Sequence, residues 1–461
     1  MTDLVVSFAL FVFLVAVMGL GPARMVAPSP AASLVIAPAA AGVMCGLAVV
    51  GALAFGTPVL PWLCALGVAG WAISSRFRVG GDTGRHAHDA WGVLFGATLV
   101  ALAPILLVRY PATAPDALHG WWFRATWFDS GGVLANTSMN DPAYAYAHPS
   151  YPPLVSGFIA STWQFARSGD REVALRLTQL LTAAAIVALS FFTISATRLR
   201  RLPAVVAAAG LAWVAWSVRL EVGLQGLVDV TWAAFLAAAA VVLLASPRHR
   251  DLAATGALFA VAAAWTKVEG QMASLLLVPL AVWRFRDAPR HVMPLLVGVS
   301  TAIGLWALVA PRPHRAITGD WSQIGDLLNS GTVIHERFVT TLSRFAAEVG
   351  PAVLAAAVVI CALIIIGRLT DRRNPQPGLV SILLLALAIF VASAATFAIR
   401  PEELDFLLDG AAGRVTAVVR LLVLADLFLA MTGTLRSLCL LDLHLPSPDE
   451  RDLEPGVVEA V

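Results

Sequence analysis

Long runs of apolar residues, separated by short polar connectors, recur from one end of the chain to the other. Many of these runs approach the length of about 20 residues that an α-helix needs to cross a hydrocarbon core of roughly 30 Å. The pattern predicts an all-α polytopic membrane protein with about 13 transmembrane helices. The predicted spans lie near 4–21, 31–55, 57–74, 90–109, 173–197, 203–218, 222–245, 251–266, 271–284, 291–310, 351–367, 378–399 and 415–437.

Arginine gathers in five short connectors, near residues 75–88, 198–201, 247–251, 284–290 and 367–373. Because cytoplasmic loops carry an excess of basic residues, all five are placed on the inner side of the membrane. The N-terminus is then outside. The transmembrane domain is expected to cover 1–437, and the polar, proline-containing segment 438–461 is expected to be a cytoplasmic, disordered tail.

This orientation leaves two long loops on the outer face, 110–172 and 311–350. Within the first, segment 152–166 is apolar, but a span there would place the basic connector 198–201 outside. We therefore expect 152–166 to lie on the outer membrane surface as a half-buried helix. Part of the second loop has apolar residues at helical spacing.

The composition supports a membrane location. Hydrophobic residues make up 59% of the 461 and charged residues only 13%, whereas soluble chains carry about 25% charge. A net charge of +2 gives no reason to expect a nucleic-acid partner. The alanine- and arginine-rich usage indicates a high-GC bacterium, so we expect a multi-pass protein of a bacterial plasma membrane.

Lys267 is the only lysine in the chain, and it stands two residues before Glu269 at a predicted outer turn between two apolar runs. Two interpretations stay open. A lysine at a helix end can extend its amine to the membrane interface while its stem stays in lipid. Alternatively, the pair belongs to a functional site, because ionisable residues near the membrane interior are costly and usually functional.

Two carboxylates raise the same question. Asp116 lies just beyond a predicted span, in a tryptophan-rich stretch that also contains Trp121 and Arg124. A helix beginning at Asp116 would place Trp121 and Arg124 one or two turns further along its register. Asp229 lies a short way into another predicted span, where it either lines a substrate pocket or pairs with Arg219 or Arg176.

Four short stretches resemble, in order, motifs of integral-membrane glycosyltransferases with the GT-C fold. They are "DALHGWWFRA" (116–125), "HPSYPPL" (148–154), "GLVDV" (226–230) and "TKVEG" (266–270). They are most similar to the protein-mannosyltransferase-like group, glycosyltransferase family 39. Ser150, Val228 and Val268 depart from that group's usual residues. The resemblance covers roughly residues 90–430 and implies a first outer loop with juxtamembrane helices.

The resemblance implies transfer of a hexose or pentose from a polyprenyl-phosphate donor to a glycan, lipid or protein acceptor on the outer face, with inversion. In that chemistry Asp116 is the general base, with Asp129 and Asp141 as rivals. Lys267 binds the lipid phosphate, and Glu269 holds the lysine or orients an acceptor hydroxyl. Arg414 is a second cation for the phosphate. The remaining candidate substrate-binding residues are His148, Tyr151, Trp121, Arg124 and Asp229.

No cofactor is expected beyond the lipid-linked sugar phosphate, which is a co-substrate. The sequence has no glycine-rich phosphate loop, and His148 has no second ligand at a suitable spacing, so we expect no catalytic metal. The competing hypothesis is a polytopic transporter or flippase of an envelope glycolipid, in which the intramembrane charges bind substrate or ions. Transporters often contain internal repeats and paired broken helices, which this sequence lacks.

The candidate residues can serve one reaction only if distant helix ends converge. We expect Asp116 and Lys267 to line one pocket that holds a sugar between them. Lys267 and Arg414 should point toward a common anion, and loop 311–350 should cover the cavity.

Overall fold

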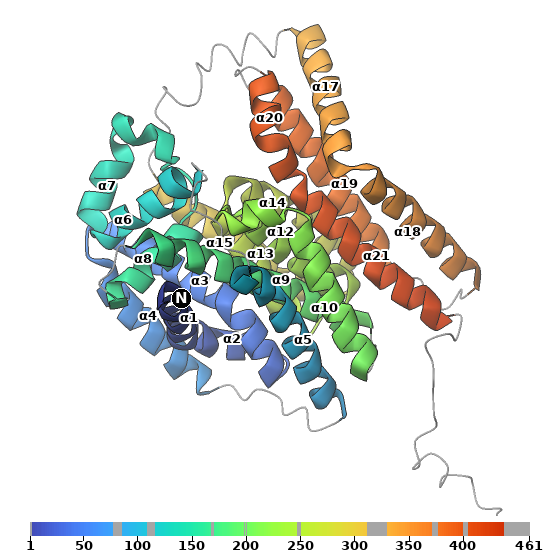
Figure 1. Ribbon diagram of the computed structural model, residues 1–461, viewed down its shortest axis with the longest axis horizontal. Coiled ribbons are helices and arrows are strands. Elements are labelled where there is room, and N and C mark those ends of the chain that lie inside the picture. The colour runs from blue at the N-terminus through green and yellow to red at the C-terminus, as the bar shows by residue number, and fades with distance from the viewer. Residues whose placement is uncertain are drawn as a thin grey trace, which may run out of the picture.

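The computed structural model describes residues 2–76, 85–107, 116–166, 170–197, 199, 201–246, 250–310, 330–370, 377–399 and 404–437. Within this part of the chain all regular structure is helical (Figure 1). The elements are α1 (Thr2–Leu14), η1 (Val15–Gly19), α2 (Leu20–Val26), α3 (Pro30–Phe55), α4 (Val59–Ser74), α5 (Arg85–Leu107), η2 (Asp116–Trp122), α6 (Phe123–Asp129), α7 (Gly132–Asn140), η3 (Pro142–Ala147), α8 (Leu154–Ala166), α9 (Arg171–Thr197), α10 (Arg201–Ser217), α11 (Leu220–Leu224), α12 (Asp229–Ala240), η4 (Val241–Ala245), α13 (Ala253–Thr266), α14 (Val268–Arg284), η5 (Pro289–His291), α15 (Met293–Val309), α17 (Gly331–Val349), α18 (Pro351–Thr370), α19 (Pro377–Ala398), α20 (Leu404–Val415) and α21 (Ala417–Ser437).

Seven helices of the described residues are long and apolar enough to cross a membrane, or eight if the bent pair α17–α18 counts as one span. They are Asp3–Val26, Pro30–Phe55, Ala90–Leu107, Arg171–Thr197, Pro289–Val309, Gly378–Ala398 and Ala411–Thr432. The chain is therefore a polytopic helical membrane protein, but the predicted thirteen spans are not confirmed. Four further apolar helices are only 10–17 residues long.

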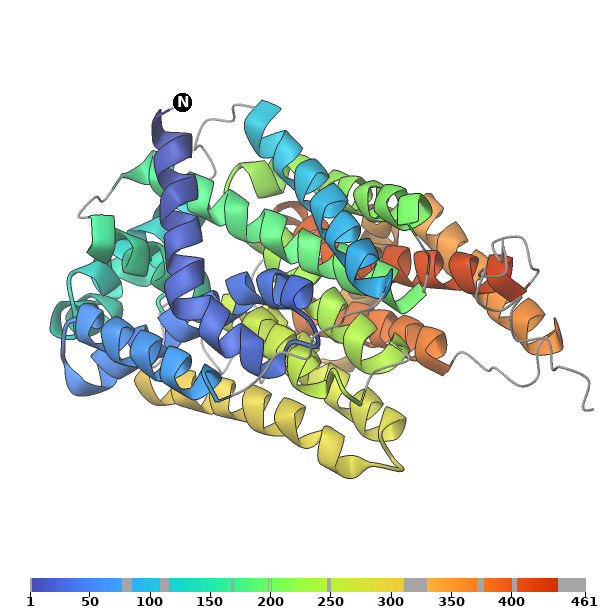
Figure 2. The same cartoon turned by 90° about the horizontal axis from the view of Figure 1, so that it is seen from below.

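The centre of the molecule is formed by α3, α9, α12 and α13 (Figure 1). Every residue of α12 is buried, because α9, α13 and α21 pack around it. The pair α5 and α10 lies along one edge of this core, and α14 and α15 lie along the other (Figure 2). Because α12 is surrounded by other helices, it needs apolar residues on all of its sides and has no polar face.

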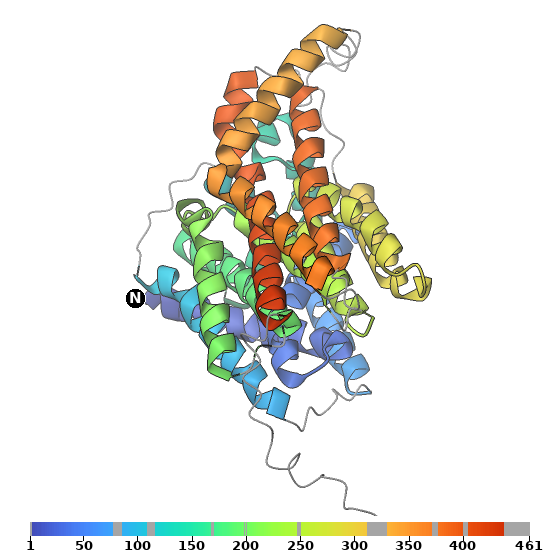
Figure 3. The same cartoon turned by 90° about the vertical axis from the view of Figure 1, so that its right-hand side faces the viewer.

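Of the C-terminal helices, α17 and α20 project beyond the rest of the bundle, whereas α21 packs against α12 of the core (Figure 3). As the spacing of its apolar residues predicts, 331–349 is an amphipathic helix, and Phe345 packs with Phe397 and Leu408 in a small separate core. The α17 axis meets α18 at 85°. The predicted covering role of loop 311–350 is not tested, because 311–329 lies outside the described residues.

Two predictions made from the sequence are wrong, one for segment 152–166 and one for the span 222–245. Segment 152–166 is not half-buried on a surface, since residues 154–163 of α8 are all buried and the helix packs against α3 and α6. The predicted span 222–245 is not continuous, because the chain breaks between α11 and α12. Gly226 has a φ of +85° at this break, a backbone conformation that glycine adopts readily.

Candidate functional site

Lys267 is the single residue that joins α13 to α14, and its backbone is extended (φ −156°, ψ 157°). The two helices form a tight hairpin because Gly270 has no side chain. A Cβ at position 270 would lie 2.1 Å from the carbonyl oxygen of Ala263. Gly270, the last residue of the "TKVEG" stretch, therefore allows the close helix approach that places Lys267 at the turn.

The Lys267 amine lies among carboxylates. Its Nζ is 2.8 Å from Oδ1 of Asp229 and 3.3 Å from Oε1 of Glu269. The other oxygen of Asp229, Oδ2, accepts a hydrogen bond of 3.0 Å from Nε of Arg414. Lys267 and Arg414 thus converge on one anion, the Asp229 carboxylate. The anion predicted from the sequence is the phosphate of a lipid donor, and binding of that phosphate stays a prediction.

Burial distinguishes the two interpretations of Lys267. Its side chain is only 4% exposed, and that of Asp229 is 1% exposed. Burial lowers the pKa of Lys267, but the carboxylates of Asp229 and Glu269 outweigh this effect, so its pKa lies above the ordinary value. The hypothesis of a lysine reaching to the membrane interface is therefore wrong, and the amine is a protonated, buried cation.

Asp229 is held by the break in the "GLVDV" stretch. It is the first residue of α12, and Gly226 in the turn before it packs under Trp122 of η2. The alternatives in which Asp229 pairs with Arg219 or Arg176 are wrong. Both arginines point elsewhere, because helix rotations that the sequence does not specify bring Lys267 and Arg414 to Asp229 instead.

A second group of charges lies beside Arg414. Arg219 donates to the carbonyl of Gly413 at 3.0 Å and forms an ion pair of 2.9 Å with Glu348 of α17. A Cβ at Gly413 would overlap the Arg219 guanidinium, so position 413 must be a glycine for this contact to form. These contacts tie the projecting helices to the core next to Arg414. No local sequence pattern predicts this role of Arg219, Gly413 and Glu348, because the three residues are far apart in the chain.

The "DALHGWWFRA" stretch is joined to the "HPSYPPL" stretch by Arg124. This arginine is fully buried, lies over the rings of Trp121 and Phe128, and donates to the carbonyl oxygens of Tyr151 and Pro152. Burial lowers the pKa of the Arg124 guanidinium to about 9, with Tyr151 acting in the opposite direction, so it stays protonated at neutral pH. Arg124 therefore serves as a clamp on the second motif.

Tyr151 connects this clamp to the charged cluster. Its ring packs against Trp121 at 5.5 Å and stacks on His148 at 4.7 Å between centroids. It also lies close enough to Lys267 to act on its pKa. His148 has a φ of +49°, uncommon for a residue other than glycine. A bond of 2.8 Å from the Trp306 indole to the carbonyl of Ser150 holds the same loop.

Of the three candidate bases, the structure describes the side-chain contacts of Asp129 and Asp141 but not those of Asp116. A helix begins at Asp116, as predicted, although it is a π-helix and the Asp116 side chain lies outside the described residues. Asp129 accepts a hydrogen bond of 2.6 Å from Gln164. Asp141 is exposed and accepts one from the backbone N–H of Ala143. The predicted pocket between Asp116 and Lys267 stays a prediction.

All four motifs and Arg414 thus belong to one connected set of contacts. Trp121 and Arg124 contact Tyr151, Trp122 lies against Gly226, and Asp229 pairs with both Lys267 and Arg414. In the comparisons with known proteins, no family model matches this chain, and no curated protein or solved structure matches it.

Proposed function

We propose that this chain is a membrane glycosyltransferase that moves a sugar from a polyprenyl-phosphate donor to an acceptor on the outer face of the membrane. The observation that carries the proposal is the convergence of Lys267 and Arg414 on one buried anion position. Cations held in place before the reaction stabilise charge that develops on a leaving phosphate better than mobile ions do. The four motifs that surround them support the same class of reaction.

Asp229 acts in this proposal as a positioning residue. It holds both cations, Lys267 at 2.8 Å and Arg414 at 3.0 Å. Glu269 is 24% exposed, and its buried Oε2 has no hydrogen-bond partner in the part of the chain that the structure describes. The donor phosphate approaches Lys267 and Arg414 from the exposed side of Arg414, and the unused Oε2 accepts a hydrogen bond from a sugar hydroxyl.

The reaction is a single displacement. The acceptor oxygen attacks C1 of the sugar, its proton passes to the Asp116 carboxylate, and the bond from C1 to the phosphate oxygen breaks. The electron pair of that bond stays on the polyprenyl phosphate, whose charge Lys267 and Arg414 stabilise. Attack opposite the leaving group inverts the configuration at C1. A carboxylate suits the role of base if it lies within hydrogen-bond reach of the hydroxyl.

The test uses the full chain in lipid nanodiscs with a panel of radiolabelled polyprenyl-phosphate sugars and an acceptor membrane extract. One donor is expected to give a labelled product with the wild-type chain. Lys267→Met and Arg414→Gln are each expected to lower transfer by about 10²–10³-fold, the effect of removing one preorganised charge-stabilising donor. Asp116→Asn is expected to abolish transfer without loss of folded protein.

The matched control is Arg344→Gln, which breaks an ion pair of similar length, 3.0 Å to Asp409, in an exposed position. This variant should transfer sugar at the wild-type rate. Normal transfer by Lys267→Met would overturn the proposal, whereas normal transfer by Asp116→Asn would overturn only the identity of the base. A wild-type chain that transfers none of the sugars also contradicts the proposal.

The second candidate function is transport or flipping of an envelope glycolipid. It is favoured by the charge balance of the cluster, in which two cations face the carboxylates of Asp229 and Glu269. Buried ion pairs of this kind are typical of substrate and ion pathways in transporters. In reconstituted vesicles, a transporter would move a labelled glycolipid between leaflets without forming a new glycosidic bond.

A further inference from the structure

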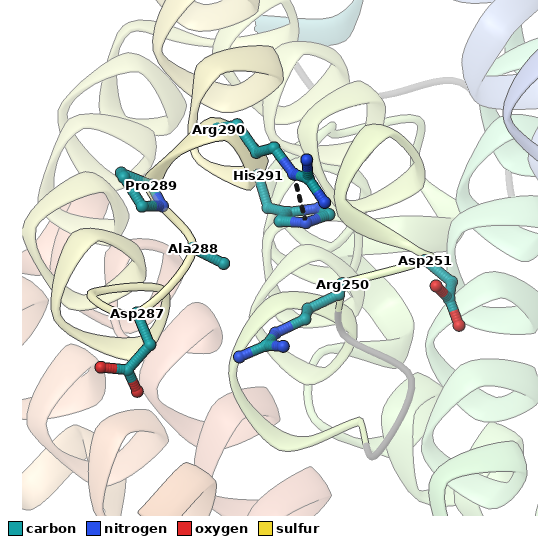
Figure 4. A pocket seen from close by; sticks show the side chains of 7 residues that line it. All are labelled: Arg250, Asp251, Asp287, Ala288, Pro289, Arg290 and His291. Atoms are coloured by element: carbon teal, nitrogen blue, oxygen red, sulfur yellow. Dashed lines mark hydrogen bonds between the residues drawn. The ribbon is translucent and has the colours of Figure 1, made fainter.

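A polar pocket lies at the end of the α13–α14 hairpin opposite Lys267. It has a volume of about 580 Å³ and is lined by residues of two loops, the one before α13 and the one between α14 and α15. The lining residues are Arg250, Asp251, Asp287, Ala288, Pro289, Arg290 and His291 (Figure 4). The α13 helix separates the pocket from Lys267 by 14 residues, or about 21 Å at 1.5 Å per residue.

The charged groups of this pocket are mostly available to a ligand. Figure 4 shows Arg290 and His291 together on one side and Arg250 extending from the other loop. Arg290 donates from Nε to Nε2 of His291 at 3.4 Å. Within the described part of the chain, Arg250, Asp251 and Arg290 form no ion pair. Their charges are therefore not neutralised by one another.

Asp287 has a weak partner, Arg286, at 3.9 Å with both side chains strongly exposed. Such a solvent-exposed pair holds its members loosely. The lining thus offers two guanidinium groups and two carboxylates. Two carboxylates disfavour a purely anionic ligand, and two guanidinium groups disfavour a purely cationic one. This combination fits a ligand that carries both a phosphate and an ammonium group.

The surroundings of the pocket indicate a lipid rather than a soluble compound. Val282 and Trp283 at the end of α14 and Met293 at the start of α15 have large exposed apolar surfaces beside the loop that lines it. In a membrane protein such helix flanks face acyl chains, and tryptophan favours the depth of the headgroups. Basic pockets between membrane helices are known to bind the phosphate-bearing headgroups of lipids.

We propose that this pocket binds the headgroup of a phosphoethanolamine lipid. The phosphate lies between Arg250 and the Arg290–His291 pair, and the ammonium group lies toward Asp287. The basic connectors 247–251 and 284–290 place this end of the hairpin at the inner leaflet. The site is separate from the proposed catalytic cluster and does not depend on the reaction catalysed there.

The test measures lipids retained by the full chain released from nanodiscs made of phosphatidylethanolamine, phosphatidylglycerol and phosphatidylcholine in equal amounts. Native mass spectrometry should show one phosphatidylethanolamine retained in preference to the other two. The double variant Arg250→Gln, Arg290→Gln should lower that retention by about tenfold or more, equal to ~1.4 kcal/mol. Asp287→Asn should shift the preference toward phosphatidylglycerol, because the partner of the ammonium group is lost.

Arg344→Gln again serves as the control, since it removes one exposed arginine far along the chain from the pocket and should leave lipid retention unchanged. Preferential retention of phosphatidylglycerol by the wild-type chain would overturn the proposal. So would equal retention of all three lipids, or retention that the double variant does not alter. Displacement of the bound lipid by inorganic phosphate alone would show a site for a soluble anion and would also overturn it.

Discussion

Replacement of Asp229 by asparagine tests whether the buried cluster holds the helices together. The substitution keeps the shape of the side chain but removes the charge that Lys267 and Arg414 share. Lys267, only 4% exposed, would retain Glu269 at 3.3 Å as its one carboxylate partner among the described residues. Arg414 is 22% exposed and can be partly hydrated.

The magnitude follows from two independent estimates. Two hydrogen bonds to charged groups are weakened, and each contributes about 1.5–3 kcal/mol, which gives roughly 3–6 kcal/mol in total. Removal of one member of a buried ion pair typically costs about 3–5 kcal/mol, because the remaining charge is buried without compensation. We therefore expect Asp229→Asn to lower the free energy of unfolding by about 3–5 kcal/mol.

The assay is reversible unfolding by SDS in mixed micelles, with helicity and tryptophan fluorescence as probes. Arg344→Ala provides the comparison, since its partner Asp409 lies at 3.0 Å but the two side chains are 48% and 74% exposed. That variant should lose only about 0–1 kcal/mol, as exposed ion pairs do. Equal losses for Asp229→Asn and Arg344→Ala would refute the reasoning from burial.

Three further substitutions address other contacts. Gly270→Ala should destabilise the chain by about 1–3 kcal/mol, because its Cβ would lie 2.1 Å from the Ala263 carbonyl oxygen; an unchanged melting temperature would contradict the close approach. Arg124→Gln should raise amide exchange at residues 148–154 more than elsewhere, since Arg124 donates to the carbonyls at Tyr151 and Pro152; a uniform increase would count against the clamp. Asp426→Leu in α21 should raise the free energy of unfolding by about 1–3 kcal/mol, because both carboxyl oxygens are buried without a hydrogen-bond partner; a loss would indicate a role that the described contacts lack.

Hydropathy predicts the existence of most helices here but not what surrounds them. The predicted span 31–55 agrees closely with α3, Pro30–Phe55, because the length of the apolar run sets the length of the helix. Segment 152–166 is misplaced because a helix covered by α3 and α6 needs the same apolar residues as one covered by lipid. For the same reason, short buried helices such as α13 cannot be distinguished from spans by composition.

In the candidate site, too, contacts between residues close in sequence can be predicted, and contacts between distant residues cannot. A unique lysine beside Glu269, between two apolar runs, is enough to predict the α13–α14 turn and a charged site. The partner of Asp229 is not predictable in this way. Its contacts with Lys267 and Arg414 bridge 38 and 185 positions of sequence, and they depend on how α12, α13 and α20 are rotated against one another.

The one-residue joint between α13 and α14 places Lys267 where two helix dipoles meet. The C-terminal end of α13 carries a partial negative charge beside the amine, and the N-terminal ends of α14 and α12 carry partial positive charges beside Glu269 and Asp229. The two carboxylates therefore lie at helix ends that favour their sign, by about 0.3–1 kcal/mol or more when partly buried, whereas Lys267 meets the favourable end of α13 and the unfavourable end of α14 together. An exchange of the two residues, Lys267→Glu with Glu269→Lys, would conserve the net charge but place a cation in the first turn of α14, where the helix end favours an anion. The backbone itself thus sets the polarity of the cluster.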